Sequence, residues 1–307
     1  MDTECTTNME NVTTPSENME DRFSLELGIG VVILYCIMGF LVLTINLLTF
    51  AIIVYFGEIK ENSNVMIASL NLAESLSGLV ILGQGLSFAL NLSNDSIIYA
   101  IGSFLNFLSL CVSQWHVVFL SLDRLIAVQC ALTYHILITS RRLKMLIFAA
   151  WGIGLLMASA LSLPFLQGLN QRNLYLFPAF QILLILVLNA VMYIQIWKVA
   201  QQQRRQITAQ EQTANPQQRI VCHNRLTSWR MDKATRIIVL IVLIFGILWT
   251  PFVVQVFRTV FGDVEYERIA YVYLVGFLNS ILNCFVYVYL NKKLRRKIRS
   301  KCLGQNQ

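Results

Sequence analysis

Long apolar stretches separated by short polar segments dominate the chain. A helix needs about 20 residues to cross a lipid bilayer. Seven apolar stretches reach that length, at 27–56, 64–90, 97–122, 145–167, 174–197, 237–257 and 269–290. Stretches this long and this poor in charge are typical of membrane spans. We therefore predict an all-α fold, a bundle of seven transmembrane helices.

The polar segments divide the chain into three regions. Residues 1–26 form a polar, acidic N-terminal tail, and 27–290 hold the seven-helix bundle. Residues 291–307 begin with a basic amphipathic run, which predicts a short helix on the membrane surface followed by a tail. Between the fifth and sixth spans, 201–229 is rich in Gln and Arg, which predicts a loop with some helical extension.

Composition supports lipid as the solvent. The chain has 307 residues, of which 56% are hydrophobic and only 13% are charged, about half the charged fraction of a soluble domain. Its net charge is +7, but no basic stripe alternates with aromatic residues, so a nucleic-acid partner is not expected. The seven cysteines form no CxxC pair, and the three histidines show no ligand spacing, so we predict no metal site.

Basic residues predict how the bundle is oriented. With the N-terminus outside, 20 Lys and Arg lie on inner segments and 4 on outer segments. Because inner loops carry the excess of positive charge, this orientation is the expected one. The sequons at Asn11, Asn91 and Asn94 then face outward, where they can be glycosylated. We expect a multi-pass protein of the plasma membrane.

Glu74 is the carboxylate placed well inside a predicted span. Burying a charge in lipid is costly, so Glu74 should face the bundle and have a partner or a proton. Amide and hydroxyl side chains in other spans can join it in one layer. A single Asn in a span is usually a helix contact, but this set could hold a monovalent cation or a proton: Asn46, Ser113, Asn279, Ser280 and Asn283.

Asp123 and Arg124 stand where the third span meets water. A solvated surface pair is the simpler interpretation; the alternative is a switch in which Arg124 leaves Asp123 for other partners.

Pro251 removes a backbone hydrogen bond from the sixth span, giving a hinge or a permanent bend. Tyr193 and Tyr287 lie near the inner ends of their spans and could reach Arg124 if those ends separate.

The chain resembles the rhodopsin-like (class A) G-protein-coupled receptors over all seven spans. Glu74, Leu248 and Cys284 replace the family's usual Asp, Cys and Pro. The segment 131–135 is also similar to melanocortin receptors, which suggests the melanocortin and lipid-receptor branch. The matching residues are Asn46, 69–74, Asp123-Arg124-Leu125, Leu132, Tyr134, Trp151, Phe245, Trp249-Thr250-Pro251, Asn279-Ser280 and 283–287.

This resemblance implies a receptor that passes an extracellular signal to a heterotrimeric G protein. The layer around Glu74 would be an allosteric sodium site, and no other cofactor is expected. The coupling residues would be Asp123, Arg124, Leu132, Tyr193, Pro251 and Tyr287. The ligand-binding residues would be Gln84, Ser103, Asn106, Trp249, Phe252, Val256 and Tyr273.

Two positions restrict the ligand that the resemblance implies. A monoamine receptor needs a carboxylate where Asn106 stands, and a retinal Schiff base needs a lysine where Phe277 stands. We therefore expect a small polar, lipid or short peptide ligand. The alternative is a transporter or proton-conducting protein using Glu74, which the lack of an inverted repeat disfavours. An enzyme is not expected, because no nucleophile is paired with a base.

Overall fold

The computed structural model describes residues 15–58, 62–90, 96–130, 133–166, 176–213, 233–262, 267–290 and 292–302. Every regular element in these ranges is an α-helix. The helices are α1 (Pro15–Tyr55), α2 (Asn62–Ala89), α3 (Ser96–Gln129), α4 (Tyr134–Leu137), α5 (Ser140–Leu166), α6 (Leu176–Thr213), α8 (Lys233–Phe261), α9 (Glu267–Leu290) and α10 (Lys292–Cys302).

Seven of these helices are long and apolar enough to cross a membrane, which confirms the predicted all-α, seven-span fold. The spans cover Gly28–Tyr55, Asn64–Ala89, Ala100–Gln129, Ser140–Ser162, Leu176–Gln202, Val239–Phe261 and Tyr271–Val288. Two helices are longer than their spans. α1 begins at Pro15, inside the predicted tail, and α6 continues to Thr213, the helical extension expected there.

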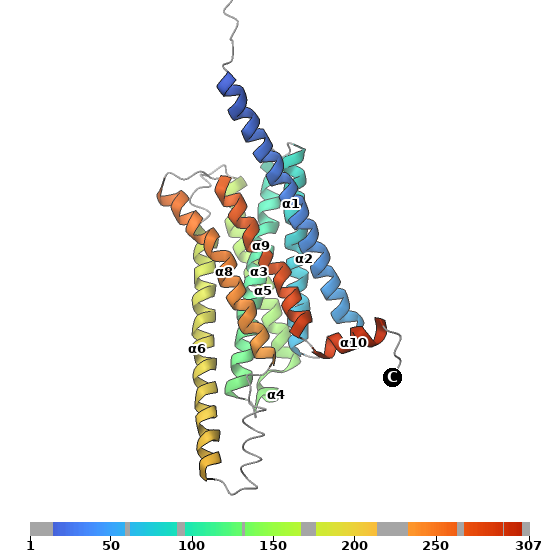
Figure 1. Cartoon of the computed structure of the whole chain (residues 1–307), viewed down its shortest axis with the longest axis vertical. Helices are drawn as coiled ribbons and strands as arrows, with labels where there is room; N and C mark the ends of the chain where they lie inside the picture. The colour runs from blue at the N-terminus through green and yellow to red at the C-terminus, as the bar shows by residue number, and fades with distance from the viewer. Residues whose placement is uncertain are drawn as a thin grey trace, which may run out of the picture.

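The long helices run side by side, with α3 packed against α2, α5, α6 and α8 (Figure 1). α1 packs on α2 and α9. Glycines bring α1 and α2 together, because a Cβ at Gly39 would overlap the backbone of Leu82, and one at Gly78 would overlap that of Leu43. Small residues at such crossings allow close packing in membranes, where dispersion contacts replace the hydrophobic effect.

Large apolar side chains cover the outside of the bundle. Phe40, Phe148, Leu156 and Ile247 are each more than half exposed. A water-soluble protein rarely shows so much contiguous apolar surface. The polar side chains are instead turned inward, among them Asn46, Glu74 and Asn279. This inside-out distribution fits a bundle surrounded by lipid.

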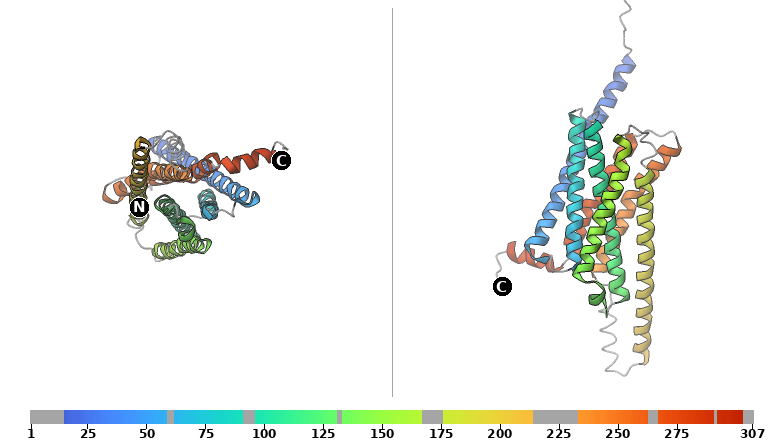
Figure 2. Two further views of the ribbon diagram at one scale, coloured as in Figure 1. Left: turned by 90° about the horizontal axis from the view of Figure 1, so that it is seen from below. Right: turned by 180° about the vertical axis from the view of Figure 1, so that it is seen from behind.

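The two ends of the bundle differ in shape. The Arg124 end carries Arg124, the short helix α4, the extension of α6 and α10, which lies across the other helices (Figures 1 and 2). The Asn106 end is the opposite one. α10 is amphipathic as predicted: Leu294 is buried against the bundle, whereas Arg295, Arg296 and Arg299 are exposed. The predicted glycosylation sites Asn11, Asn91 and Asn94 lie outside the described residues.

Candidate functional site

At the Arg124 end, Arg124 binds its neighbour Asp123. The guanidinium donates from Nε to Asp123 Oδ2 at 2.9 Å, and Nη2 donates to the same oxygen. The side chain of Arg124 is 8% exposed and that of Asp123 is 1% exposed. The pair is therefore buried, unlike the solvated surface pair that was the simpler interpretation. A buried charge that leaves its partner must find another.

Tyr134 in α4 holds the second oxygen of the same carboxylate. Its hydroxyl donates to Asp123 Oδ1 at 2.7 Å. α4 is a single turn that follows α3 in the chain. Asp123 is therefore fixed from two sides, by Arg124 and by Tyr134. The sequence analysis named Tyr134 among the residues that match the receptor family, but it did not predict that Tyr134 binds Asp123.

The two tyrosines expected near Arg124 lie on different elements and have different partners. Tyr193 in α6 lies 3.3 Å from Ser121 Oγ, one turn before Arg124 in α3. Ser121 also donates to Asn189 Oδ1 at 2.6 Å, a bond that sequence reasoning missed. Tyr287 in α9 instead donates to Asn64 Oδ1 at 3.1 Å.

An apolar layer lies beside these polar groups. Val117 of α3 packs with Ile241 and Val242 of α8, and Tyr193 and Val286 pack against them. This layer ties α3, α6, α8 and α9 together near the Arg124 end. Separating the Arg124 ends of these helices therefore means opening this layer.

Two predicted coupling residues remain outside this cluster. Pro251 lies within α8 with its side chain exposed on the outer face of the bundle. The residue before it, Thr250, donates to Gly246 O at 2.6 Å, which occupies a carbonyl one turn earlier. Leu132 lies outside the described residues.

At the centre of the bundle, Glu74 joins three helices. Ser113 of α3 donates to Glu74 Oε1 at 2.5 Å, and Ser280 of α9 donates to Oε2. Glu74 itself is 3% exposed. The structure thus gives the buried carboxyl group the partners that its burial requires. The longer side chain of Glu allows both oxygens to reach a serine hydroxyl on a different helix.

Cys284, which replaces the family's usual proline, takes part in this layer. Its thiol donates to Asn46 Oδ1 at 3.0 Å and lies 3.5 Å from Asn71 Oδ1. Asn46 Nδ2 in turn donates to Val42 O at 2.9 Å. The sequence identified Asn46 as a member of the layer but not the cysteine that binds it.

Oxygen atoms in the same layer lack partners. Among the described residues, Asn279 Oδ1 and both polar atoms of the Asn283 side chain are buried without a hydrogen bond. The side-chain oxygens of Asn279 and Asn283, together with those of Glu74, Ser113 and Ser280, make an all-oxygen set of the kind that hard cations prefer. The residues present therefore fit a sodium ion by donor chemistry. The described part of the chain holds no cluster of three His, Cys, Asp or Glu side chains for a transition metal.

At the Asn106 end, Tyr273 of α9 binds Asn106 of α3. The tyrosine hydroxyl donates to Asn106 Oδ1 at 2.7 Å. The ring of Tyr273 packs against Phe252, Phe277 and Trp249, with ring centres 5.5, 4.8 and 6.0 Å away. One polar pair thus lies on an aromatic cluster that joins α3, α8 and α9.

Trp249 lies at the centre of this cluster. Its ring makes edge contacts with Phe252 and Phe277 and lies 6.2 Å from Phe245, one turn along α8. A Cβ on Gly276 would approach the Trp249 ring to 2.9 Å. The absence of a side chain at Gly276 therefore makes the room in which the indole lies.

The other predicted ligand residues surround this cluster less directly. Val256 is fully buried one turn beyond Phe252 in α8. Ser103 is half-buried and precedes Asn106 by one helical turn, and Gln84 is half-buried in α2. No hydrogen bond between side chains of the described residues joins Gln84 or Ser103 to Asn106. The structure therefore brings Asn106, Trp249, Phe252 and Tyr273 together most clearly.

Comparison with known proteins agrees with this arrangement. The family model described as 7 transmembrane receptor (rhodopsin family) matches residues 45–174 and 166–287. The chain belongs to the rhodopsin family of seven-transmembrane receptors. It is therefore a multi-pass membrane receptor, which decides between the receptor and the transporter that the sequence left open.

Curated relatives are trace amine-associated receptors. The chain is 25% identical over 305 residues to trace amine-associated receptor 8a of Rattus norvegicus, covering 89% of this chain and 87% of the relative. It is 26% identical over 284 residues to receptor 365 of Petromyzon marinus, covering 81% and 73%. These relatives do not test the likeness to melanocortin and lipid receptors, which stays a prediction.

Proposed function

We propose that this receptor lies in the plasma membrane with its N-terminus outside and couples a ligand at the Asn106 end to a heterotrimeric G protein at the Arg124 end. The observation that carries the proposal is the buried pair of Asp123 and Arg124, closed by Tyr134. This pair lies at the end where the exposed basic side chains of α10 gather, such as Arg296 and Arg299. The excess of basic residues supports our proposal that this end faces the cytosol.

Signal transfer in this proposal is a shift between two arrangements of the bundle. A ligand that binds one arrangement more tightly raises its population by the difference in binding free energy. The aromatic cluster of Trp249, Phe252 and Tyr273 lies beneath the ligand. Phe245 and the apolar layer around Val117 and Ile241 lie between this cluster and Arg124. Opening that layer frees Arg124 to contact the G protein.

We further propose that the ligand is a neutral molecule. A buried ammonium group needs a carboxylate nearby, because an unpaired charge in an apolar site is costly. Where the structure describes side chains, the carboxylates are Glu58, Glu74 and Asp123. Glu58 and Asp123 lie at the Arg124 end and Glu74 at the centre. Asn106 and Tyr273 instead offer neutral hydrogen-bonding groups above aromatic rings, which suits a ligand with one polar group and an apolar body.

The names of the relatives favour a second candidate, an amine ligand. They are called trace amine-associated receptors, and sequence identity of about a quarter leaves room for a change of ligand. The two candidates make different demands on the charge near Asn106. An amine receptor would require another counter-charge, whereas a neutral ligand requires none.

Replacing Asn106 by Asp tests the ligand class. Cells carrying wild-type receptor and Asn106→Asp would be screened with 2-phenylethylamine and with neutral analogues of the same size, using reporters for each class of G protein. We expect the amine to activate Asn106→Asp at a concentration at least about tenfold lower than any that activates the wild type, which corresponds to about 1.4 kcal/mol of binding. Strong activation of the wild type by the amine would support the second candidate.

We also propose that the layer around Glu74 binds a sodium ion. Its support is the set of buried oxygens without partners on Asn279 and Asn283, beside a carboxyl group. A bound sodium ion would balance the charge of the Glu74 carboxylate. Ser113 and Ser280 hold that carboxylate in place from two other helices.

A further inference from the structure

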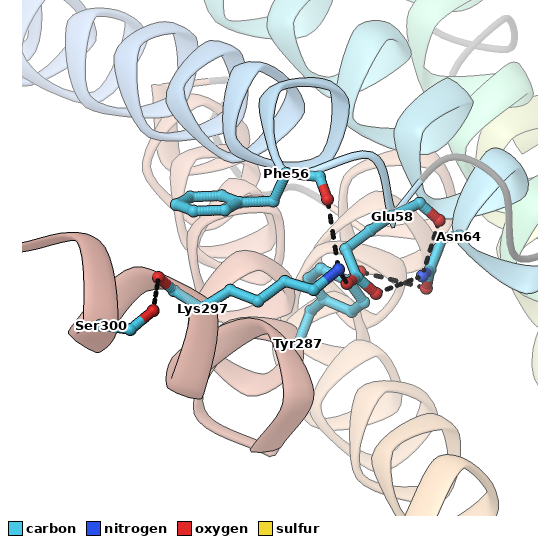
Figure 3. Close-up of polar contacts among 6 residues, drawn as sticks. All are labelled: Phe56, Glu58, Asn64, Tyr287, Lys297 and Ser300. Carbon is cyan, nitrogen blue, oxygen red and sulfur yellow. Dashed lines mark hydrogen bonds and ion pairs between the residues drawn. The ribbon is translucent and has the colours of Figure 1, made fainter. Parts of the chain in front are cut away.

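Four side chains from four segments form a continuous polar network at the Arg124 end (Figure 3). They are Glu58 in the turn after α1, Asn64 in the first turn of α2, Tyr287 in α9 and Lys297 in α10. We refer to these four residues as the Glu58 network. It lies apart from the Asp123 pair, and none of the roles discussed above uses Glu58 or Lys297.

Lys297 and Glu58 make the ion pair of the network. Lys297 Nζ binds Glu58 Oε1, and it also donates to the backbone oxygen of Phe56 at 3.2 Å. The Glu58 side chain is only 3% exposed, whereas that of Lys297 is 49% exposed. The two partners therefore depend on the ion pair to different degrees. Lys297 can turn to water, whereas the buried carboxylate of Glu58 relies on Lys297 to balance its charge.

Asn64 connects this ion pair to Tyr287. Its Nδ2 donates to the backbone oxygen of Glu58 at 3.1 Å and lies 3.4 Å from Glu58 Oε2. Its Oδ1 accepts the hydroxyl hydrogen of Tyr287 at 3.1 Å. Glu58 therefore orients the amide group of Asn64, and that amide group holds the Tyr287 hydroxyl.

Local structure explains why Glu58 points inward. α1 ends at Tyr55, and Gly57 follows with a φ of 68°, a left-handed conformation that glycine adopts without strain. Glu58 follows this glycine directly and is buried, with its side chain in contact with Asn64 of α2 and Lys297 of α10. On the other side, Leu294 of α10 packs with Ile53 and Tyr287, which fixes α10 beside the turn and places Lys297 next to Glu58.

We propose that Glu58 is a positioning residue for signalling, and that its ion pair with Lys297 holds Tyr287 in the arrangement that does not couple. This inference rests on the proposed function, because Tyr287 is one of the residues expected to reach Arg124. When the ion pair breaks, the Glu58 carboxylate turns toward water and Asn64 loses one of its two acceptors, Glu58 Oε2, while keeping the backbone oxygen. The amide group of Asn64 is then held less firmly, which weakens its hydrogen bond with Tyr287, and Tyr287 moves more easily toward α3. The docking of α10 thereby controls how readily the receptor couples.

Basal nucleotide exchange on a purified heterotrimeric G protein tests the proposal. We expect Glu58→Gln and Lys297→Gln each to raise basal exchange about threefold or more at equal receptor amount. The charge-reversed double variant, Glu58→Lys with Lys297→Glu, should return it toward the wild-type rate. Arg296→Gln is the matched control, because it removes the same charge from an exposed neighbouring position of α10, and it should leave basal exchange unchanged.

The opposite results overturn the proposal. If both single variants leave basal exchange unchanged or lower it, Glu58 does not restrain Tyr287. If Arg296→Gln raises exchange as much as Lys297→Gln, the net charge of α10 is responsible and not the ion pair. Should Glu58→Gln fail to fold, Lys297→Gln still tests the network, since its side chain is half exposed.

A second measurement needs no G protein and separates this proposal from the proposed function. Fluorotyrosine placed at position 287 reports its surroundings by ¹⁹F NMR of the purified receptor in detergent. We expect Glu58→Gln and Lys297→Gln to shift this resonance in the same direction, and Arg296→Gln to leave it in place. A shift without any exchange by the wild type would reject G-protein coupling but keep the network. An unshifted resonance in Glu58→Gln would reject the network itself.

Discussion

The hydroxyl of Ser280 donates a hydrogen bond to Oε2 of Glu74, which ties α9 to α2 across the centre of the bundle. Ser113 of α3 binds the other oxygen of the same carboxyl group. Any movement of α9 relative to α2 and α3 must therefore carry these bonds along or break them. The Glu74 carboxyl group is placed to respond to the arrangement of the helices.

Replacing Glu74 by Gln tests the sodium proposal. The amide keeps the size of the side chain but removes the charge that would attract a cation, and its nitrogen must donate to one of the two serines that now donate to the carboxylate. At a sodium concentration tenfold above its dissociation constant, the wild type should gain about 1.4 kcal/mol in unfolding free energy. Thermal unfolding in NaCl and in choline chloride of equal ionic strength measures this gain, and Glu74→Gln should show none. Equal stability of the wild type in both salts would reject the site.

Removing the hydroxyl of Tyr134 should loosen the Asp123 pair. Tyr134→Phe deletes the 2.7 Å hydrogen bond to Asp123 Oδ1 and leaves the ring in place. A bond of this kind contributes about 1 kcal/mol, so basal nucleotide exchange should rise up to about fivefold. The exposed Thr133→Ala serves as a neighbouring control. An unchanged basal rate in Tyr134→Phe would show that Tyr134 does not restrain Arg124.

Substitutions of Cys284 should show how much of its contribution to stability comes from its hydrogen bond and how much from packing. Cys284→Ala leaves Asn46 Oδ1 without the thiol donor in a buried site, and it should lower the unfolding free energy by about 1–3 kcal/mol. Cys284→Ser keeps a donor and should lose less. In thermal unfolding in detergent, we expect the wild type to have the highest melting temperature, Cys284→Ser the next and Cys284→Ala the lowest. If Ser and Ala are equally destabilised, the thiol stabilises by packing and not by donation.

Adding a methyl group at Gly276 should displace Trp249. The new Cβ would lie 2.9 Å from ring atoms of the indole, so the ring must shift, at a cost of about 1–3 kcal/mol. We expect Gly276→Ala to unfold at lower temperature and to bind ligand more weakly. Gly152→Ala is the control, because nothing lies within 4 Å of the added Cβ there. A wild-type melting temperature in Gly276→Ala would show that the indole has free space.

Much of the fold could be predicted from the sequence because lipid imposes a simple rule. Each span must satisfy its own backbone and present apolar side chains outward, so length and charge alone located all seven helices. The start of α1 at Pro15 could not be predicted, because residues 15–26 are polar. They are helical as an N-terminal extension of the first span, which follows them in the chain.

The candidate site could be predicted only in part, because its residues meet across helices. The cost of burying Glu74 indicated that partners must exist, and Ser113 and Ser280 were among those named. Glu58 and Lys297 gave no such signal, since an acid in a short connector and a base in a basic run both read as solvated charges. Their pairing follows from the place where α10 docks, which no local pattern encodes.

The central claim is that Arg124 changes partners when the receptor couples. Nucleotide exchange by a heterotrimeric G protein, measured with purified receptor in lipid nanodiscs, tests it most directly. Wild-type receptor should accelerate exchange. Arg124→Ala, used at the same amount and shown by its melting temperature to be folded, should give an exchange rate no higher than that with empty nanodiscs. Full acceleration by Arg124→Ala would contradict the account.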